Sequence, residues 1–444
     1  MSADDTTPAS LDPTVDAPPS AGGSSARVDV PRPSMRALLR LHDFRMLLVM
    51  QFASTVRQPM LFFAQAWYVN LAAPESQRVI LLGVLGAVRG GTHLAYAVFG
   101  GAIADRFPRG QALMVSHVAS LIVSSGIGLL LYVPAVARGE GPWLWVMFPL
   151  FATFGLWTAQ DQPTRTAMVR DVVPASALTS AIMLHQLLMA IAFLPAPLLA
   201  GWTIDRFGFA TTYLLSGVGH IVVMIALVAM RSPGGVADPT ARGESVIQNM
   251  RAGFAVMRAD PVVRWTILLT WVVFAAALSV MGILIAAWVQ DILLLSATGW
   301  GWMALCWGIG GLLSSVWLMW RADSRRKGAL FLGSCALMGL SVLAFGLSRS
   351  IPTAFFWNGV AGLANALVLT LGIALVQEIV PNRVLGRVTS LLLLSQGLLQ
   401  VAGLAVGLIA QAVGLPVIYP LAGALVLVVT LAATVVQRPL RTAR

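Results

Sequence analysis

The sequence has little charge, almost no lysine and few cysteines. Only 11% of its 444 residues are charged, whereas about a quarter are charged in a soluble protein. The only lysine, Lys327, follows no Gly-x-x-x-x-Gly-Lys-[Ser/Thr] loop, so the sequence offers no phosphate-cradling ATP site. Cys306 and Cys335 indicate neither a disulfide framework nor a metal site. With no nucleophile motif and no metal-ligand spacing, the sequence predicts neither an enzyme nor a cofactor-binding protein.

Long apolar runs, in contrast, are abundant. The chain is 58% hydrophobic and its mean hydropathy is +0.82. About 20 apolar residues span a bilayer as one helix, which satisfies its own backbone hydrogen bonds. The sequence therefore predicts an all-α integral membrane protein with twelve transmembrane helices, at about 45–70, 79–103, 111–134, 143–168, 178–202, 209–230, 264–289, 298–320, 328–348, 353–376, 388–412 and 416–436.

The distribution of the arginines predicts the orientation. The net charge of +11 could indicate a nucleic-acid partner. However, the basic residues concentrate in the two tails and the even-numbered loops, which is the positive-inside pattern. We therefore expect both termini in the cytoplasm, the lipid bilayer as the surroundings of the chain, and no nucleic-acid partner.

The spans divide into two pseudo-symmetric six-helix halves. "VRDVVPASALTSA" from Val169 and "VQEIVPNRVLGRV" from Val376 share the pattern Val-x-acid-aliphatic-Val-Pro, each between an even and an odd span, as in parallel-repeat transporters. In the longest inner connection, apolar residues recur at helical spacing and predict an amphipathic helix under the membrane. The expected organisation is a disordered tail (1–35), an N-terminal half (36–230), a linker (231–263), a C-terminal half (264–437) and a short tail (438–444).

The stretch "FGGAIADRFPRG" clusters Gly101, Asp105, Arg106 and Arg109 between spans two and three. It resembles the Gly-x-x-x-Asp-Arg-x-Gly-Arg loop of the major facilitator superfamily, although Pro108 replaces the second glycine. The resemblance covers residues 36–437 and is greatest to the subfamily of enterobactin exporter-like and macrolide-efflux-like proteins. It implies the major facilitator fold, alternating access and a multi-pass protein of the plasma membrane, which in bacteria is the inner membrane.

The resemblance also implies a conformational latch formed by this loop. Asp105 would accept hydrogen bonds from the start of span eleven near Arg387, since a carboxylate is favoured at a helix N-terminus. Such a contact would join the halves at the inner side and hold the outward-open state. Arg109 then needs an acidic partner, for which Asp161 is the first candidate and Asp171 the alternative.

Span five resembles an exporter motif in degraded form. In "AFLPAPLLAG" the pattern Gly-x-x-x-Gly-Pro-x-x-Gly-Gly keeps Pro197 and Gly201, while Ala196 replaces a glycine. Small residues allow close helix packing and proline bends the helix, so the stretch is either an export motif or a simple kink. A second Gly-x-x-x-Asp-Arg copy runs from Gly201 to Gly208; we expect it in an outer loop and assign it no function.

Polar residues within the spans are candidates for a substrate cavity. Arg57 and Arg89 lie at similar depth, where a charge usually faces a cavity. They either give a central cavity a positive potential or bond backbone groups between helices, and the sequence offers no carboxylate at that depth. Six tryptophans near the outer ends of the spans are expected to form an interfacial belt: Trp67, Trp143, Trp145, Trp288, Trp300 and Trp302. The other candidate cavity residues are Gln58, His93, His185, Asn365 and Gln396.

The sequence predicts a secondary transporter that exports a small molecule, either an amphipathic drug or a siderophore-like compound, as a monomer. Proton coupling is implied by the resemblance alone, although His93 or His185 could titrate near neutral pH. One alternative is an importer of an organic anion, which the two arginines favour. Another is a non-transporting, transporter-like sensor, against which the retained loop motifs argue.

Overall fold

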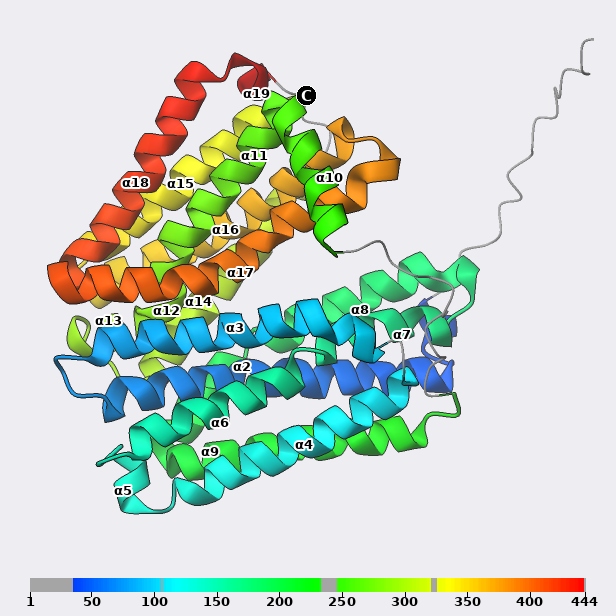
Figure 1. Cartoon of the computed structure of the whole chain (residues 1–444), viewed down its shortest axis with the longest axis vertical. Helices are drawn as coiled ribbons and strands as arrows, with labels where there is room; N and C mark the ends of the chain where they lie inside the picture. The colour runs from blue at the N-terminus through cyan, green and yellow to red at the C-terminus, as the bar shows by residue number, and fades with distance from the viewer. Residues whose placement is uncertain (1–34, 105–106, 233–245, 321–325, 443–444) are drawn as a thin grey trace, which may run out of the picture.

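The computed structural model describes residues 35–104, 107–232, 246–320 and 326–442, and these form two helical bundles that meet along one end (Figure 1). Within the described ranges every regular element is a helix. The prediction of an all-α protein is therefore confirmed. Asp105 and Arg106, the N-terminal tail and part of the linker lie outside the described residues.

The N-terminal half contains the first six spans, and two of these are broken. Span four is interrupted at Ala159 and Gln160, and span five at Leu194 and Pro195. Spans five and six share the label α9, although the chain turns sharply between them at Gly208, whose φ of 79° suits glycine. The expected outer loop is thus only a tight turn. The helices are α1 (Met35–Leu38), α2 (His42–Ala72), α3 (Arg78–Ala104), α4 (Arg109–Leu130), α5 (Pro134–Ala137), α6 (Trp143–Thr158), α7 (Asp161–Val172), the 3₁₀ turn η1 (Ala175–Ala177), α8 (Leu178–Phe193) and α9 (Ala196–Ala229).

The C-terminal half repeats this arrangement, with a segmented seventh span. A π-helical turn, η2 (Val273–Leu278), interrupts that span where it faces the centre of the molecule; such turns are frequent at functional sites. The helices are α10 (Val246–Ala259), α11 (Pro261–Val272), α12 (Ser279–Ile283), α13 (Ile285–Asp291), α14 (Ala297–Trp320), α15 (Lys327–Leu347), α16 (Ile351–Ile379), α17 (Asn382–Val413), α18 (Leu415–Val436) and α19 (Arg438–Thr442).

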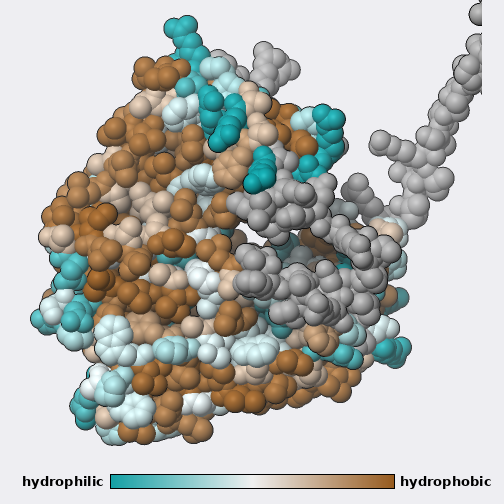
Figure 2. All heavy atoms as spheres, in the orientation of Figure 1, coloured by the Kyte–Doolittle hydropathy of each residue, from teal (hydrophilic) through white to brown (hydrophobic). Residues whose placement is uncertain are grey.

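The helices suit a membrane. Nine stretches of the described chain are long and apolar enough to cross one, and the stretch Ala175–Ala229, at 55 residues, holds two spans. Helices α2 and α6 bring the number of spans to twelve. Large apolar side chains cover much of the outward surface, with Val228 74% and Ile122 67% exposed (Figure 2). This is the fold of a multi-pass membrane protein with two six-helix halves.

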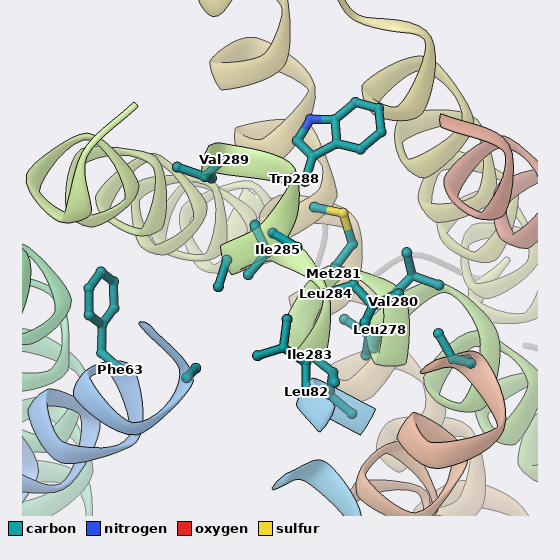
Figure 3. Packing of buried hydrophobic residues seen from close by; sticks show 14 of the residues in the cluster. Phe63, Leu82, Leu278, Val280, Met281, Ile283, Leu284, Ile285, Trp288 and Val289 are labelled. Atoms are coloured by element: carbon teal, nitrogen blue, oxygen red, sulfur yellow. The ribbon is translucent and has the colours of Figure 1, made fainter. Parts of the chain in front are cut away.

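The two halves touch most closely at one end, which we call the outer end because the charge pattern predicts that orientation. There α3 and α17 approach so closely that a Cβ on Gly83 would lie 2.7 Å from the carbonyl oxygen of Gly403. Ile283 of α12 inserts beside Gly86 and Gly403, within the apolar packing in Figure 3. Small residues therefore let these helices seal the outer end.

Hydrogen bonds reinforce the seal between the halves. Arg78 at the start of α3 donates to Asp291 over 2.5 Å, and Asn70 Nδ2 donates to the carbonyl oxygen of Ala286 over 3.3 Å. Between α9 and α14, Asp205 accepts a 2.8 Å hydrogen bond from the backbone N–H of Thr298. Toward the opposite, inner end the bundles diverge (Figure 1).

Linker helix α10 contacts the C-terminal half. Phe254 meets Trp271 edge-on with ring centroids 6.2 Å apart, and Met257 is buried in the same cluster. Asp260 caps α11 by accepting hydrogen bonds from two backbone N–H groups. At these residues the apolar face of the predicted amphipathic helix is turned to protein rather than to lipid.

Candidate substrate cavity

A cavity of about 910 Å³ lies between the two halves. It is bounded by α2, α3, α7, α8 and α9 of the N-terminal half and by η2, α12, α13, α14, α16 and α17 of the C-terminal half. Its lining runs from Trp300 near the outer end to Gln162 and Ser315 toward the inner end. The volume is that of a small-molecule site.

The polar lining holds arginines and amides. No Asp or Glu occurs among the described residues that line the cavity. Arg89 reaches Gln65 Oε1 through Nε and a terminal nitrogen, at 3.1 and 3.0 Å, and also bonds the carbonyl oxygen of Phe62 at 2.5 Å. Its guanidinium lies 4.9 Å from the Phe62 ring centroid. Arg89 is thus held beside an aromatic ring, with no counter-charge among these partners.

Aromatic rings close the cavity at its outer end. Phe63 of α2 stacks on Trp300 of α14 with ring centroids 3.7 Å apart. Both residues line the cavity, as do Phe193, Phe274 and Trp307. The expectation of an interfacial belt is wrong for Trp67, Trp288 and Trp300, which are all buried, whereas Trp145 and Trp302 are exposed. The sequence reveals depth along a helix but not which face carries the ring.

Four of the predicted cavity residues lie in the lining: Gln58, Arg89, Asn365 and Gln396. The other three do not. His93 is exposed and bonds the backbone carbonyl of Arg89, one turn earlier in its own helix. His185 is buried, at 2% exposure, outside the lining.

Arg57 is the third residue wrongly predicted to line the cavity, since its side chain points into the N-terminal bundle instead. It lies 3.2 Å from Asp161 Oδ2, and both side chains are 2% exposed. The expectation that no carboxylate neutralises Arg57 was therefore wrong. Asp161 begins α7, a helix separate from α6, and this break in span four brings its carboxylate to the depth of Arg57.

Asp161 also binds a second arginine, which sequence reasoning missed. Arg165, one turn along α7, donates from Nε to Asp161 Oδ1 at 2.7 Å and from a terminal nitrogen to Oδ2 at 3.3 Å. Its remaining nitrogen bonds Gln51, which lines the cavity together with Arg165 itself. The i,i+4 spacing of Asp161 and Arg165 was the signal in the sequence.

Two histidines complete this cluster. His117 of α4 lies 3.3 Å from Asp161 Oδ1 through Nε2, and its Nδ1 lies 3.0 Å from Nδ1 of His220 on α9. His220 Nε2 is 3.2 Å from a terminal nitrogen of Arg57. We call these five residues, Arg57, His117, Asp161, Arg165 and His220, the buried charge network. Nothing in the sequence places His117 beside His220, because 103 residues separate them.

The predicted latch is only partly described. Arg109 donates hydrogen bonds to both carboxylate oxygens of Asp171, at 2.8 and 2.7 Å. The first candidate for its partner, Asp161, was therefore wrong, and the alternative, Asp171, is the residue that it binds. Gly101 lies in α3 and Arg387 in α17. Since Asp105 and Arg106 fall outside the described residues, the contact between Asp105 and span eleven stays a prediction.

The export-like motif in span five forms the contact with α14. Ala196 is fully buried, and a Cβ on Gly201 would lie 2.2 Å from the carbonyl oxygen of Ala297. Gly301 of α14 also lies close to α9, since its Cβ would lie 2.9 Å from the carbonyl oxygen of Pro197. Pro197 also lines the cavity. The small residues therefore serve the contact between the halves at the outer end.

Comparison with known proteins identifies the family. The sequence profile of the transmembrane secretion effector family matches residues 34–443. The chain belongs to this family of the major facilitator superfamily. It is similar to enterobactin exporter EntS of Shigella boydii serotype 18 and of Escherichia coli O81, with 24% identity over 359 residues in each case, or 80% of this chain and 82% of the relative. These relatives are transporters rather than enzymes, so the chain is a membrane transporter of the EntS-like subfamily.

Solved structures share the fold at low sequence identity. A bacterial homologue of the human lysosomal transporter Spinster, inward-facing and unoccupied, has a TM-score of 0.64 and 16% identity, covering 90% of this chain and 96% of that one. A peptide transporter of the POT family in complex with sulfate has a TM-score of 0.70 and 14% identity, covering 93% and 97%. They support the major facilitator fold. Among the described residues no cluster of His, Cys, Asp and Glu could hold a metal ion.

Proposed function

We propose that the chain exports an aromatic, acceptor-rich small molecule, of the siderophore-like kind, from the cytoplasm by alternating access. The observation that carries this proposal is the chemistry of the cavity, where arginines, amides and aromatic rings meet with no carboxylate in the described lining. Guanidinium and amide N–H groups donate to oxygen acceptors, and rings stack on aromatic substrates. The similarity to enterobactin exporters supports the direction of transport.

The cavity disfavours the other exported class, an amphipathic cationic drug. A cation in a low-dielectric cavity is best stabilised by a counter-charge, and the described lining contains no Asp or Glu. The lining already contains the positive charges of Arg89 and Arg165, which repel a further cation. A neutral or anionic aromatic molecule is therefore the better match.

Alternating access is supported by the seal at the outer end and by the position of the cavity between the halves. In the proposed cycle the substrate enters from the inner side, and separation of the outer contacts around Phe63, Trp300 and Asp205 then releases it outside. We also propose proton coupling, cytoplasmic termini and action as a monomer.

The test is accumulation of labelled compounds in cells that lack their own efflux pumps. The panel comprises catecholate siderophores, macrolides and cationic dyes, with wild type compared with Arg89→Gln. We expect lower accumulation of the catecholates in wild-type cells and loss of that effect in the variant. Arg206→Gln is the matched control, because Arg206 is exposed on a helix end away from the cavity lining. Lower accumulation of the dyes alone would overturn the proposed substrate class.

An importer of an organic anion is the second candidate, favoured by Arg89 and Arg165 in a cavity lining with no described acid. Inverted membrane vesicles separate the two directions. A proton-coupled exporter accumulates substrate inside them when the lumen is made acidic, because protons leaving the lumen then exchange for entering substrate; an importer that takes up substrate together with protons does not.

A further inference from the structure

We infer that the His117–His220 pair is the site where this transporter takes up and releases a proton. The inference rests on the proposed proton coupling and names its residues, which neither the family resemblance nor the cavity chemistry supplies. The pair is buried: His117 is 1% and His220 0% exposed. It lies between Arg57 and Asp161, whose hydrogen-bonding roles are fixed.

Those fixed roles determine the tautomer of each ring. An arginine only donates, so His220 Nε2, at 3.2 Å from Arg57, must accept and the His220 proton must be on Nδ1. That Nδ1–H donates across 3.0 Å to Nδ1 of His117. The proton of His117 is therefore on Nε2, where it donates to Asp161 Oδ1 over 3.3 Å. Both rings are neutral, and every contact pairs one donor with one acceptor.

An added proton cannot enter this arrangement without breaking a particular contact. A proton on His117 Nδ1 would face the N–H of His220, and one on His220 Nε2 would face the N–H of Arg57. At 3.0 and 3.2 Å two facing donors repel, so His220 must move away from His117 in the first case and from Arg57 in the second. The pair therefore has two discrete arrangements, one neutral and one protonated. The structure corresponds to the proton-free form, in which the outer end is sealed.

The surrounding groups leave the histidine pair as the member of the network that can take up a proton. The facing charged groups are Arg57 on α2, and Asp161 and Arg165 on α7; α6 contributes only Phe154, whose ring lies 6.4 Å from that of His220. On α8, His185 interacts electrostatically with Arg165. Arginine stays protonated, and a carboxylate held by two arginines stays ionised. The neutral imidazoles are therefore the groups of the network that can accept a further proton.

The network also reaches the cavity, where protons can exchange. Arg165 donates to Gln51, and both line the cavity. Gln51 in turn donates to Thr55 over 2.9 Å, and Thr55 lines the cavity as well. The step is a proton transfer from hydronium in the cavity to an imidazole nitrogen. It breaks one O–H bond of the hydronium, leaves a water molecule and forms one N–H bond, with no change of oxidation state.

Protonation would act on helix packing because the pair joins α4 to α9. The backbone of α9 lies tightly on Arg57, since a Cβ on Gly219 would be 3.1 Å from Arg57 Cβ. Separating His117 from His220 therefore shifts the part of α9 that follows the turn at Gly208 against α2 and α4. The part of α9 that precedes this turn carries the outer contacts Gly201 and Asp205, so the proton site is linked to the seal between the halves through two successive spans joined at Gly208.

The experiment uses the full-length protein in proteoliposomes, with a catecholate siderophore as substrate and a pH-sensitive dye inside. His117→Gln and His220→Gln should reduce substrate-dependent proton movement to less than a tenth of the wild-type rate. Exchange of labelled for unlabelled substrate needs no net proton movement, and it should stay within about threefold of wild type. The control is His42→Gln, because His42 lies at the inner end of α2 and bonds only the carbonyl oxygen of Ala229 in the described chain.

The outcomes distinguish a failure of proton-coupled export from a failure of the histidine pair as the proton site. If export by the wild type moves protons and both histidine variants still move them, the inference is overturned while proton-coupled export stands. If the wild type exports without proton movement, coupling is wrong and the inference falls with it. If no substrate in the panel moves, ¹⁵N-histidine NMR of the purified protein still decides. The signals of the two rings should change together as the pH is lowered, and the pH at which the His220 signal changes should shift in His117→Gln; two rings that titrate independently would overturn the inference.

Discussion

The two halves share a fold but differ in what they bury. The N-terminal half buries the five-residue charge network at its centre. In the C-terminal half the buried polar side chains of the described residues are Ser, Thr and Asn alone. Duplicated halves need equal packing but not equal chemistry. The difference suggests that energy coupling resides in the first half, while the second provides a mainly apolar surface that moves against it.

Removing the negative charge from the network should have the largest effect. Asp161→Asn leaves Arg57 and Arg165 buried without a counter-charge, and breaking a buried ion pair costs about 3–5 kcal/mol. We expect a large fall in the unfolding temperature in detergent and loss of transport. Arg57→Gln combined with Asp161→Asn should recover part of the stability, because one unpaired cation is then gone.

The substitution in the C-terminal half to compare with Asp161→Asn is Asn358→Ser. It removes the 2.6 Å hydrogen bond from the Asn358 side chain to the carbonyl oxygen of Met303. A single neutral hydrogen bond contributes about 1 kcal/mol. If Asn358→Ser destabilised the protein as much as Asp161→Asn, the proposed asymmetry of the halves would be wrong.

Packing within the C-terminal half can be broken by one methyl group. In Gly310→Ala the new Cβ would lie 2.0 Å from the carbonyl oxygen of Gly359 and 2.9 Å from the backbone nitrogen of Leu363, so α14 and α16 must separate. Such overpacking costs about 1–3 kcal/mol. Thermal unfolding of the purified protein measures it.

The neighbouring Gly311→Ala is the control, because its Cβ has no contact closer than 4.0 Å. In the N-terminal half Gly126→Ala meets nothing within 4 Å and should also be tolerated. Equal destabilisation by Gly310→Ala and Gly311→Ala would mean that the helix contact does not limit stability.

A substitution in the cavity wall tests the chemistry of the site rather than its stability. Arg89→Gln removes the guanidinium that bonds Gln65 and Phe62, and we expect about a tenfold weaker apparent affinity for an anionic substrate, equivalent to roughly 1.4 kcal/mol. Transport rate against substrate concentration in vesicles gives the affinity and the maximal rate separately. A change in the maximal rate alone would argue against direct contact with the substrate.

These contrasts show what the sequence could and could not predict. Hydropathy gave twelve spans, because lipid demands long apolar helices whatever their packing. Gln58 and Asn365 were assignable to the cavity because polar groups at mid-membrane need a polar surrounding. The direction of Arg57 was not predictable, since it depends on which face of α2 meets Asp161, and that contact follows from the break between α6 and α7.

The smallest predicted effect concerns the outer end, where the second Gly-x-x-x-Asp-Arg copy has a clear structural place. Asp205 accepts a hydrogen bond from Thr298 N–H at the start of α14, which also neutralises part of the helix dipole. Losing such a cap costs about 1 kcal/mol. Asp205→Ala should therefore shift the balance toward the outward-open state by about fivefold.

Spin labels at Arg138 and Leu294, in a background without Cys306 and Cys335, would report this shift as a longer distance between the outer ends of the halves. Both positions are exposed, at 65% for the Arg138 side chain and 83% for Leu294. Arg206→Gln alters the adjacent charge but not the cap, so its distance distribution should match wild type. An unchanged distribution in Asp205→Ala would assign the outer seal to the glycine contacts at Gly201 and Gly301, which depend on shape rather than charge.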